Sequence, residues 1–122
     1  MSKTILIVDD SASVRQVVSI ALRGAGYDVI TAVDGRDALG KLDGQRIHLI
    51  ISDVNMPNMD GITFVAEAKK VPAYKFTPII MLTTESQEEK KRQAQAAGAK
   101  AWGTKPLQPP QMLAAVSKLT MP

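Results

Sequence analysis

Side chains suited to metal or phosphate chemistry follow four short, mostly apolar runs of this chain. In chain order they are Asp9 with Asp10, Asp53, Thr83 and Lys105. Three carboxylates in one place repel one another, and a hard cation relieves that repulsion. Oxygen donors in a chain without cysteine favour Mg²⁺ over zinc. A carboxylate can act as a nucleophile and a lysine can pair with phosphoryl oxygens, so the set is suited to placing a phosphoryl group on an aspartate.

These side chains meet only if the runs are parallel strands of one sheet. Residues 5–8, 49–51 and 79–82 are continuous apolar runs, which are typical of strands covered on both faces. Weaker strands are expected at 29–30 and 101–103. Apolar residues at helical spacing follow each run, so the pattern predicts an α/β fold, a doubly wound five-stranded parallel sheet with five helices. The strands of such a sheet all end at one edge, where ligands bind.

The predicted helices carry recognisable start and stop signals. The start signals are Ser11 or Ser13, Asp34, Ser86 with Glu89, and the pair Pro109 and Pro110. The stop signals are Gly24, Gly26 and Gly98. The apolar face of the fourth helix is expected to be thin and to consist of Ala94, Ala96 and Ala97. Segment 71–78 is polar and twice broken by proline, so it is predicted to be a loop.

Composition restricts the class of protein. The absence of cysteine excludes a disulfide framework, a thiol nucleophile and a cysteine-ligated zinc site. The longest early apolar run is too short for a signal peptide or a membrane span, so we expect a cytoplasmic protein without a membrane partner. The net charge is +3, and the basic cluster at 90–92 is interpreted as a solvated helix face rather than a nucleic-acid site. A length of 122 residues predicts one domain, 1–122.

Four motifs in order carry a family resemblance. They are the acid pair after the first strand, D-x-x-M-P-x-M-D-G at 53–61, a threonine after the fourth strand, and Lys105 with Pro106 after the fifth. With them, essentially the whole chain resembles a response-regulator receiver domain of the stand-alone, CheY-like chemotaxis type. The resemblance implies a flavodoxin-like sheet of order 2-1-3-4-5 and a single receiver domain without an output domain.

The resemblance also implies roles for the acids. Asp53 corresponds to the phosphoacceptor. Asp10 and Asp53 correspond to side-chain ligands of Mg²⁺, whereas Asp9 binds the ion mostly through water. Asn55 is expected to give the ion its backbone carbonyl. Cofactor and phosphoacceptor are therefore expected at one site.

The remaining site residues are assigned in the same way. Lys105 corresponds to the residue that pairs with the phosphoryl group, and Thr83 to the switch hydroxyl that turns towards it. Trp102 stands where the family has a switch aromatic, although a packing role is nearly as well supported. Asn55 and Glu85 resemble the residues that tune self-dephosphorylation, because both are polar and could position a water molecule.

The function implied is that of a phosphorylation-switched signalling protein in a two-component system. A sensor histidine kinase of the chemotaxis type would phosphorylate Asp53, and a downstream target, such as the flagellar motor switch, would read the change. A phosphatase is a further candidate partner, and a monomer is expected. The only enzymatic activities implied are self-phosphorylation from phosphodonors and autodephosphorylation. A phosphorelay shuttle or sink, passing the group to a histidine phosphotransfer domain, shares the whole site and stays open as the alternative.

Two other classes fit the sequence less well, and some positions depart from the family. An aspartyl-phosphate hydrolase needs a second acid where Asn55 stands, and a nucleotide-binding module needs a glycine-rich loop after the first strand. Thr84 is larger than the usual residue and could narrow access to Asp53. Leu107 replaces a frequent phenylalanine, a change that we expect the packing to absorb.

Overall fold

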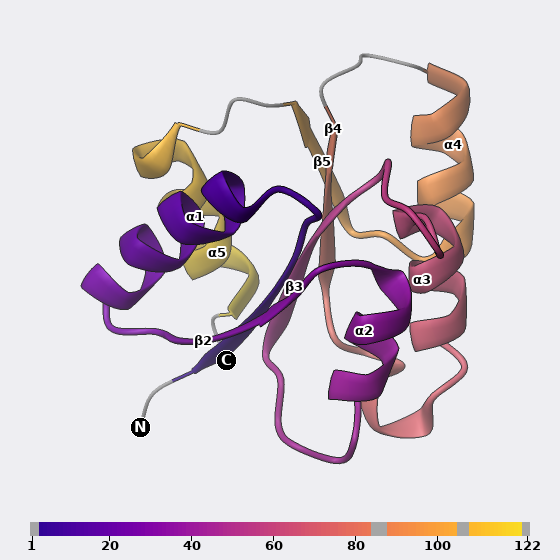
Figure 1. The fold of residues 1–122 in the computed structure, drawn as a ribbon, viewed down its shortest axis with the longest axis horizontal. Coiled ribbons are helices and arrows are strands. Elements are labelled where there is room, and N and C mark those ends of the chain that lie inside the picture. Colours follow the sequence, from indigo (N-terminus) through magenta and orange to yellow (C-terminus); the bar gives the residue numbers. More distant parts are fainter. Residues whose placement is uncertain (1–2, 84–87, 105–107, 121–122) are drawn as a thin grey trace.

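The computed structural model describes residues 3–83, 88–104 and 108–120 (Figure 1). Strands and helices alternate along them, as predicted. In chain order they are β1 (Thr4–Val8), α1 (Ala12–Gly24), β2 (Asp28–Ala32), α2 (Gly35–Lys41), β3 (Leu49–Asp53), α3 (Gly61–Ala68), a 3₁₀ helix (Pro72–Tyr74), β4 (Ile79–Thr83), α4 (Glu88–Ala97), β5 (Ala101–Thr104) and α5 (Pro109–Thr120).

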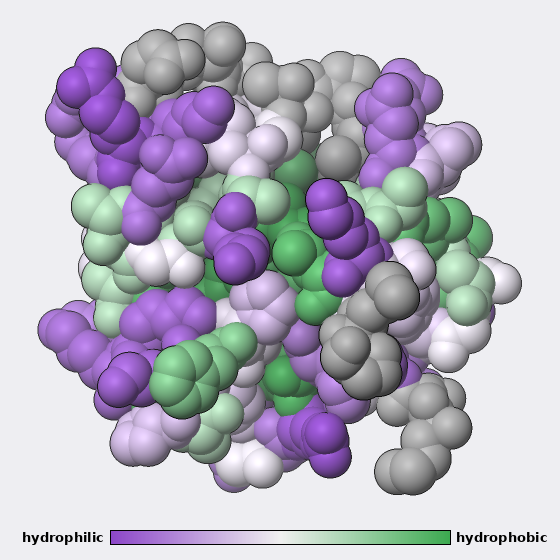
Figure 2. All heavy atoms as spheres, turned by 180° about the vertical axis from the view of Figure 1, so that it is seen from behind, coloured by the Kyte–Doolittle hydropathy of each residue, from purple (hydrophilic) through white to green (hydrophobic). Residues whose placement is uncertain are grey.

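The five strands form one parallel sheet in the order β2-β1-β3-β4-β5. This confirms both the doubly wound fold and the predicted strand order. Helices α1 and α5 cover one face of the sheet, and α2, α3 and α4 cover the other (Figure 1). Seen from the opposite side, hydrophilic side chains cover much of the surface and hydrophobic ones lie between them (Figure 2).

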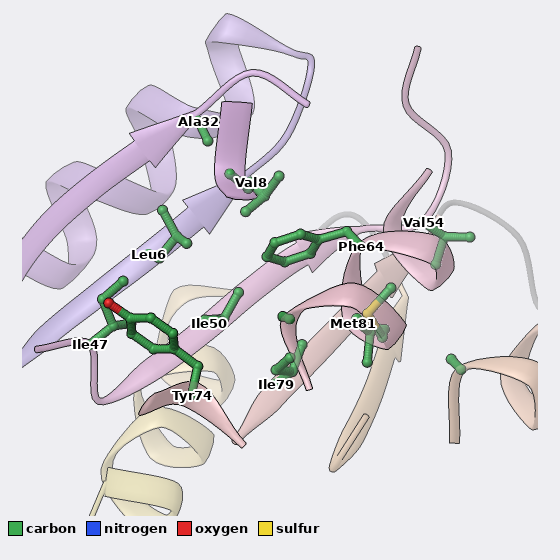
Figure 3. Close-up of a cluster of buried hydrophobic side chains, with 14 residues drawn as sticks. Leu6, Val8, Ala32, Ile47, Ile50, Val54, Phe64, Tyr74, Ile79 and Met81 are labelled. Atoms are coloured by element: carbon green, nitrogen blue, oxygen red, sulfur yellow. The ribbon is translucent and has the colours of Figure 1, made fainter. Parts of the chain in front are cut away.

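Both faces of the sheet are buried, which explains why its strands are continuous apolar runs. Ile5 and Ile7 pack into the core beneath α1 and α5, whereas Leu6 and Val8 pack into the core on the other face. Phe64 of α3 is fully buried in this second core (Figure 3). The helices on both sides of the sheet hold its strand ends in place.

Side-chain caps start three of the helices at the carboxyl edge of the sheet. Ser11 rather than Ser13 caps α1, accepting a bond from the Val14 N–H at 3.3 Å. The Asp34 carboxylate caps α2, as predicted. Asp60 caps α3, accepting a bond of 2.7 Å from the backbone N–H of Thr63. The predicted capping pair of α4 cannot be compared, because Ser86 lies outside the described residues.

Two predictions about local structure were wrong. Segment 71–78 is more than a polar loop, because it contains the 3₁₀ helix and buries Tyr74. Ala96 is exposed although it was assigned to the apolar face of α4, where Ala94 is buried. With 3.6 residues per turn, a residue two positions after Ala94 points well away from the buried face. Among the described residues, no helix is long and apolar enough to cross a membrane.

Candidate functional site

Three carboxylates meet at the carboxyl edge of the sheet. Asp9 and Asp10 follow β1, and Asp53 is the last residue of β3, the neighbouring strand. One carboxylate oxygen from each lies within 4.8 Å of the others. Asp9 and Asp53 are only 2% and 7% exposed, whereas Asp10 is exposed to solvent. The predicted meeting of these acids is therefore confirmed, with two of them buried and one on the surface.

Backbone N–H groups orient the two buried carboxylates. The Ser11 N–H donates to Oδ1 of Asp9 at 2.9 Å, and the Val54 N–H donates to Oδ1 of Asp53 at 2.9 Å. The Val54 N–H also donates to the carbonyl of Leu82 in β4 at 3.0 Å, and Ser11 lies in the turn between β1 and α1. The turns that follow β1 and β3 thus fix the acids that those strands deliver.

Arg15 adds a positive charge beside the cluster that the sequence analysis missed. Its guanidinium donates a hydrogen bond of 2.7 Å to the backbone carbonyl of Asp9. The side chain reaches back from the first turn of α1 across six positions, and no motif in the sequence marks that contact. Arg15 therefore ties the start of α1 to the end of β1.

The donor set fits a hard divalent cation. Three carboxylates within 4.8 Å carry three negative charges when ionised, and they offer only oxygen donors. Mg²⁺ prefers one or two such carboxylates together with waters and phosphate oxygens. The chemistry of Asp9, Asp10 and Asp53 thus matches the predicted ion. Asn55 follows β3 in an exposed loop, in the segment from which a backbone carbonyl was expected.

Thr83 ends β4, the strand that pairs with β3 on the other side. Asp53 pairs in register with Leu82, so Thr83 lies one position further along the neighbouring strand. Its side chain is buried, with 3% exposed. The sheet thus brings Thr83 to the same edge as the acids. Lys105, Glu85, Thr84 and Leu107 lie outside the described residues, so their predicted places stay predictions.

Trp102 is half-buried in β5, the edge strand. It pairs in register with Met81 of β4 and packs against the core that contains Phe64. The packing role that was considered for this residue is therefore present. A movement of the indole on activation stays a prediction.

A second contact missed by sequence analysis joins the loop after β3 to the start of α2. The Asn58 side-chain amide donates to Oδ2 of Asp34 at 2.7 Å. Oδ1 of the same carboxylate accepts the Asp37 N–H at 2.8 Å. These hydrogen bonds lower the pKa of Asp34, and the bond from the Asp37 backbone contributes most. Asn58 itself has a left-handed backbone, with φ of 66°.

The glycine of the D-x-x-M-P-x-M-D-G motif has a steric reason. A Cβ atom at Gly61 would lie 2.0 Å from the backbone oxygen of Asp53. The Gly61 N–H also donates to the Val54 carbonyl at 2.8 Å. The first residue of α3 therefore closes directly against the end of β3, which only a residue without a side chain permits.

Comparisons with known proteins agree with this geometry. A family model described as the response regulator receiver domain matches residues 5–117. Protein PilG of Pseudomonas aeruginosa is 35% identical over 112 residues, which cover 92% of this chain and 83% of that protein. The alkaline phosphatase synthesis transcriptional regulatory protein PhoP of Bacillus subtilis is 37% identical over 119 residues, 98% of this chain but only 49% of that protein.

Solved structures give the same result. The chemotaxis protein CheY4 of Vibrio cholerae superposes with a TM-score of 0.93 at 49% identity, covering 98% of this chain and 99% of that one. A CheY-like receiver domain protein from Methanospirillum hungatei superposes with a TM-score of 0.91 at 29% identity, covering 98% and 94% of the two chains. The similarity thus extends over the whole sheet and its helices.

Proposed function

The chain belongs to the response regulator receiver domain family of two-component systems, and from that premise we propose that it is a signalling switch set by phosphorylation of Asp53. One observation carries the proposal. Asp9, Asp10 and Asp53 bring carboxylate oxygens within 4.8 Å of one another at the edge where parallel strands end. Of the three, Asp53 ends a strand in the middle of the sheet, between β1 and β4.

The proposed transfer uses the Asp53 carboxylate as a nucleophile. One of its oxygens forms a bond to phosphorus while the bond between phosphorus and the phosphohistidine nitrogen of the sensor kinase breaks. The electron pair stays on that nitrogen, which takes a proton from solvent. A bound Mg²⁺, held by Asp9, Asp10, Asp53 and the Asn55 carbonyl, would neutralise charge on the phosphoryl oxygens.

In a separate hydrolysis step, water removes the phosphoryl group. The water oxygen bonds to phosphorus while the bond between phosphorus and the Asp53 oxygen breaks. The Asp53 carboxylate keeps the electron pair, and inorganic phosphate leaves after the water has lost a proton to solvent. Asn55 and Glu85 are the residues that we assign to positioning this water, since both are polar and flank the acceptor and the switch threonine in sequence. Autodephosphorylation then resets the switch without a second protein.

The readout of the switch begins at the residues around the acceptor. The added charge attracts the hydroxyl of Thr83 and the ammonium of Lys105. Thr83 is buried at the end of β4, so its rotation requires side chains around it to move. Trp102, half-buried on the neighbouring strand, is the side chain that we assign to transmit that change.

The partners follow from the same role. We propose a chemotaxis-type sensor histidine kinase as donor and a protein such as the flagellar motor switch as target, with the chain acting as a cytoplasmic monomer. The resemblance to a protein named as a chemotaxis regulator, at 49% identity, favours this role over a phosphorelay. Rapid transfer from phosphorylated Asp53 to a histidine phosphotransfer domain would favour the phosphorelay instead.

The test is phosphorylation of the pure chain by acetyl phosphate and Mg²⁺, followed by intact mass. We expect a gain of one phosphoryl group that a chelator and Asp53→Asn both abolish. Asp60→Asn is the matched control, because this exposed acid caps α3 and asparagine caps equally well. Phosphorylation of the Asp53→Asn variant, or its loss in Asp60→Asn, would contradict the assignment. So would failure of the native chain with both acetyl phosphate and a phosphorylated kinase.

A further inference from the structure

Basic residues gather at the edge of the sheet opposite the carboxylates. The loops before the strands and the last turns of the helices meet there, carrying nine lysines and arginines and three acids. The basic residues are Lys3, Arg23, Lys41, Arg46, Lys69, Lys70, Lys75, Lys100 and Lys118, and the acids are Asp28, Asp43 and Glu67. The net charge of +3 of the chain is therefore distributed unevenly, with a strongly positive surface at the amino ends of the strands.

Helix dipoles account for some of this charge but not for all of it. Arg23, Lys41 and Lys118 lie in the last turns of their helices, where a cation is favourable. Lys75 and Lys100 lie instead in the loops before β4 and β5. The salt bridges found within the described chain involve neither of these two lysines. Their charges are thus available at the surface.

An exposed aromatic side chain stands beside these lysines. Phe76 is 88% exposed, although Tyr74, two positions before it, and Thr77, the next residue, are buried. The Lys69 ammonium donates to the backbone carbonyls of Lys75 and Thr77, which flank the ring in sequence. The turn is therefore held in a conformation that points Phe76 outwards. The Lys75 ammonium lies 5.6 Å from the ring centroid, close enough for a cation–π interaction.

A hollow of about 410 Å³ opens next to Phe76. Its lining includes Lys75, Phe76, Pro78, Gly98, Lys100 and Leu119, and no carboxylate belongs to it among the described residues. Gly98 keeps the hollow open, because its φ of 121° and a Cβ position 2.9 Å from Cγ of Lys69 exclude a larger residue. We call this surface the basic hollow.

We propose that the basic hollow is a docking surface for an acidic peptide segment that carries an apolar side chain. The apolar side chain would enter the hollow and cover the ring of Phe76, removing an aromatic surface from water. Carboxylates on either side of it would pair with Lys75 and Lys100. Charge complementarity specifies an acidic partner, and a concave site beside the ring suits an inserted side chain better than a flat membrane surface.

Occupation of this surface is independent of the phosphorylation site. Pro78 and Lys100 precede β4 and β5, whereas Thr83 and Asp53 end their strands. The five-residue strand β4 separates the two edges by about 16.5 Å at its rise of ~3.3 Å per residue. A partner could therefore stay bound to the basic hollow in both states of the switch.

The test is a fluorescence anisotropy titration with a labelled peptide of glutamates around one leucine, without Mg²⁺ or phosphodonor. We expect saturable binding that weakens with salt. Lys75→Glu combined with Lys100→Glu should raise the Kd at least about tenfold, and Phe76→Ser should raise it about fivefold, because both charge and apolar contact contribute. Both variants alter exposed side chains, so the fold should be retained.

The matched control carries Arg36→Glu with Arg92→Glu, an equal change of charge at the carboxylate edge. We expect its Kd to stay within about twofold of the native value. An equal loss of affinity in this control would mean general charge attraction and would overturn the proposal. The absence of peptide binding would also overturn the proposal. In a parallel titration with vesicles that contain phosphatidylserine, binding to the vesicles but not to the peptide would do the same. None of these outcomes depends on phosphorylation of Asp53.

Discussion

Asn58 shows how a single side chain can order the loop around the acceptor. It is the non-glycine residue of the described chain that has a positive φ, and its amide bonds to the buried Asp34 carboxylate 24 positions earlier. The loop between β3 and α3 is therefore attached to the cap of α2. Because Asn55 lies in the same loop, we expect this hydrogen bond also to help order the carbonyl that we assign to Mg²⁺.

Replacing Asn58 separates the backbone effect from the hydrogen bond. Asn58→Ala should lower the free energy of unfolding by about 1 kcal/mol more than Asn58→Gly, because a residue with a Cβ is strained at positive φ. Both variants lose the bond to Asp34 and should weaken Mg²⁺ binding. Urea denaturation and Mg²⁺ titration measure the two effects.

The pH dependence tests the same bond. Hydrogen bonds lower the pKa of Asp34 in the folded chain, so their stabilisation is present above the ordinary aspartate pKa and is lost as the pH falls. The difference between native chain and Asn58→Gly should therefore shrink at acid pH. A difference that stays constant down to that range would show that Asp34 is not the partner that matters.

Contacts between single side chains could be predicted only where the strands themselves bring the residues together. Asp9, Asp10 and Asp53 could be predicted because each directly follows or ends a buried strand, and parallel strands share one edge. Asn58 and Arg15 could not, because their partners are reached through loop geometry or a side-chain reach of several positions. The sequence contains the residues but not those contacts.

Among the elements, the connection from α3 to β4 has a structural role that its polar sequence concealed. The Tyr74 hydroxyl donates to the Gln45 carbonyl at 2.7 Å and accepts the Gly44 N–H at 2.9 Å. Its ring packs in the core that also contains Ile47 (Figure 3). The 3₁₀ helix thus fastens the loop between α2 and β3. The two prolines of segment 71–78 suggested a loop. The burial of Tyr74 could not be predicted, because its hydroxyl bonds to Gln45, which lies 29 residues earlier in the chain.

Removing that hydroxyl tests the connection. Tyr74→Phe should lower the free energy of unfolding by about 1 kcal/mol, because two hydrogen bonds are lost while the ring still packs. Hydrogen exchange at the Gly44 amide should become faster. Tyr27→Phe is the control, since this tyrosine is half-buried and no hydroxyl bond is found for it in the described chain. If neither the free energy of unfolding nor the exchange rate changed, the Tyr74 hydroxyl would not stabilise the loop between α2 and β3.

At the scale of the molecule, the strand and helix pattern was predictable and the charge distribution only partly so. Buried strands such as β1 and β3 could be predicted from their continuous apolar sequences, because both faces of the sheet are covered. The acids at one edge follow from the same pattern. The basic hollow does not, because Lys69 and Phe76 come from the connection between α3 and β4 and Gly98 from that between α4 and β5. Their packing depends on the folded chain.

The acids at one edge of the sheet and the basic residues at the other lead to a prediction about the stability of the whole chain. Removing an acid raises the net charge of +3, so repulsion over the whole chain predicts a small destabilisation. At the carboxylate cluster the local effect has the opposite sign. Asp10→Asn should raise the free energy of unfolding by about 1 kcal/mol without Mg²⁺ at low ionic strength, because two buried acids lose a like-charged neighbour. Asp10 is the suitable position, since it is the exposed member of the cluster.

Excess Mg²⁺ should reverse that order. An ion that binds only the folded chain stabilises it by about 2.7 kcal/mol at a hundredfold excess over its Kd. The native chain should gain this increment and Asp10→Asn much less of it, because the variant has lost one donor of the cluster. Urea denaturation with and without Mg²⁺ measures all four values, and Asp28→Asn, an exposed acid at the other edge, is the control. If Mg²⁺ raises the free energy of unfolding of Asp10→Asn as much as that of the native chain, Asp10 is not a ligand of the ion. The clustering of the three acids would then need an explanation other than metal binding.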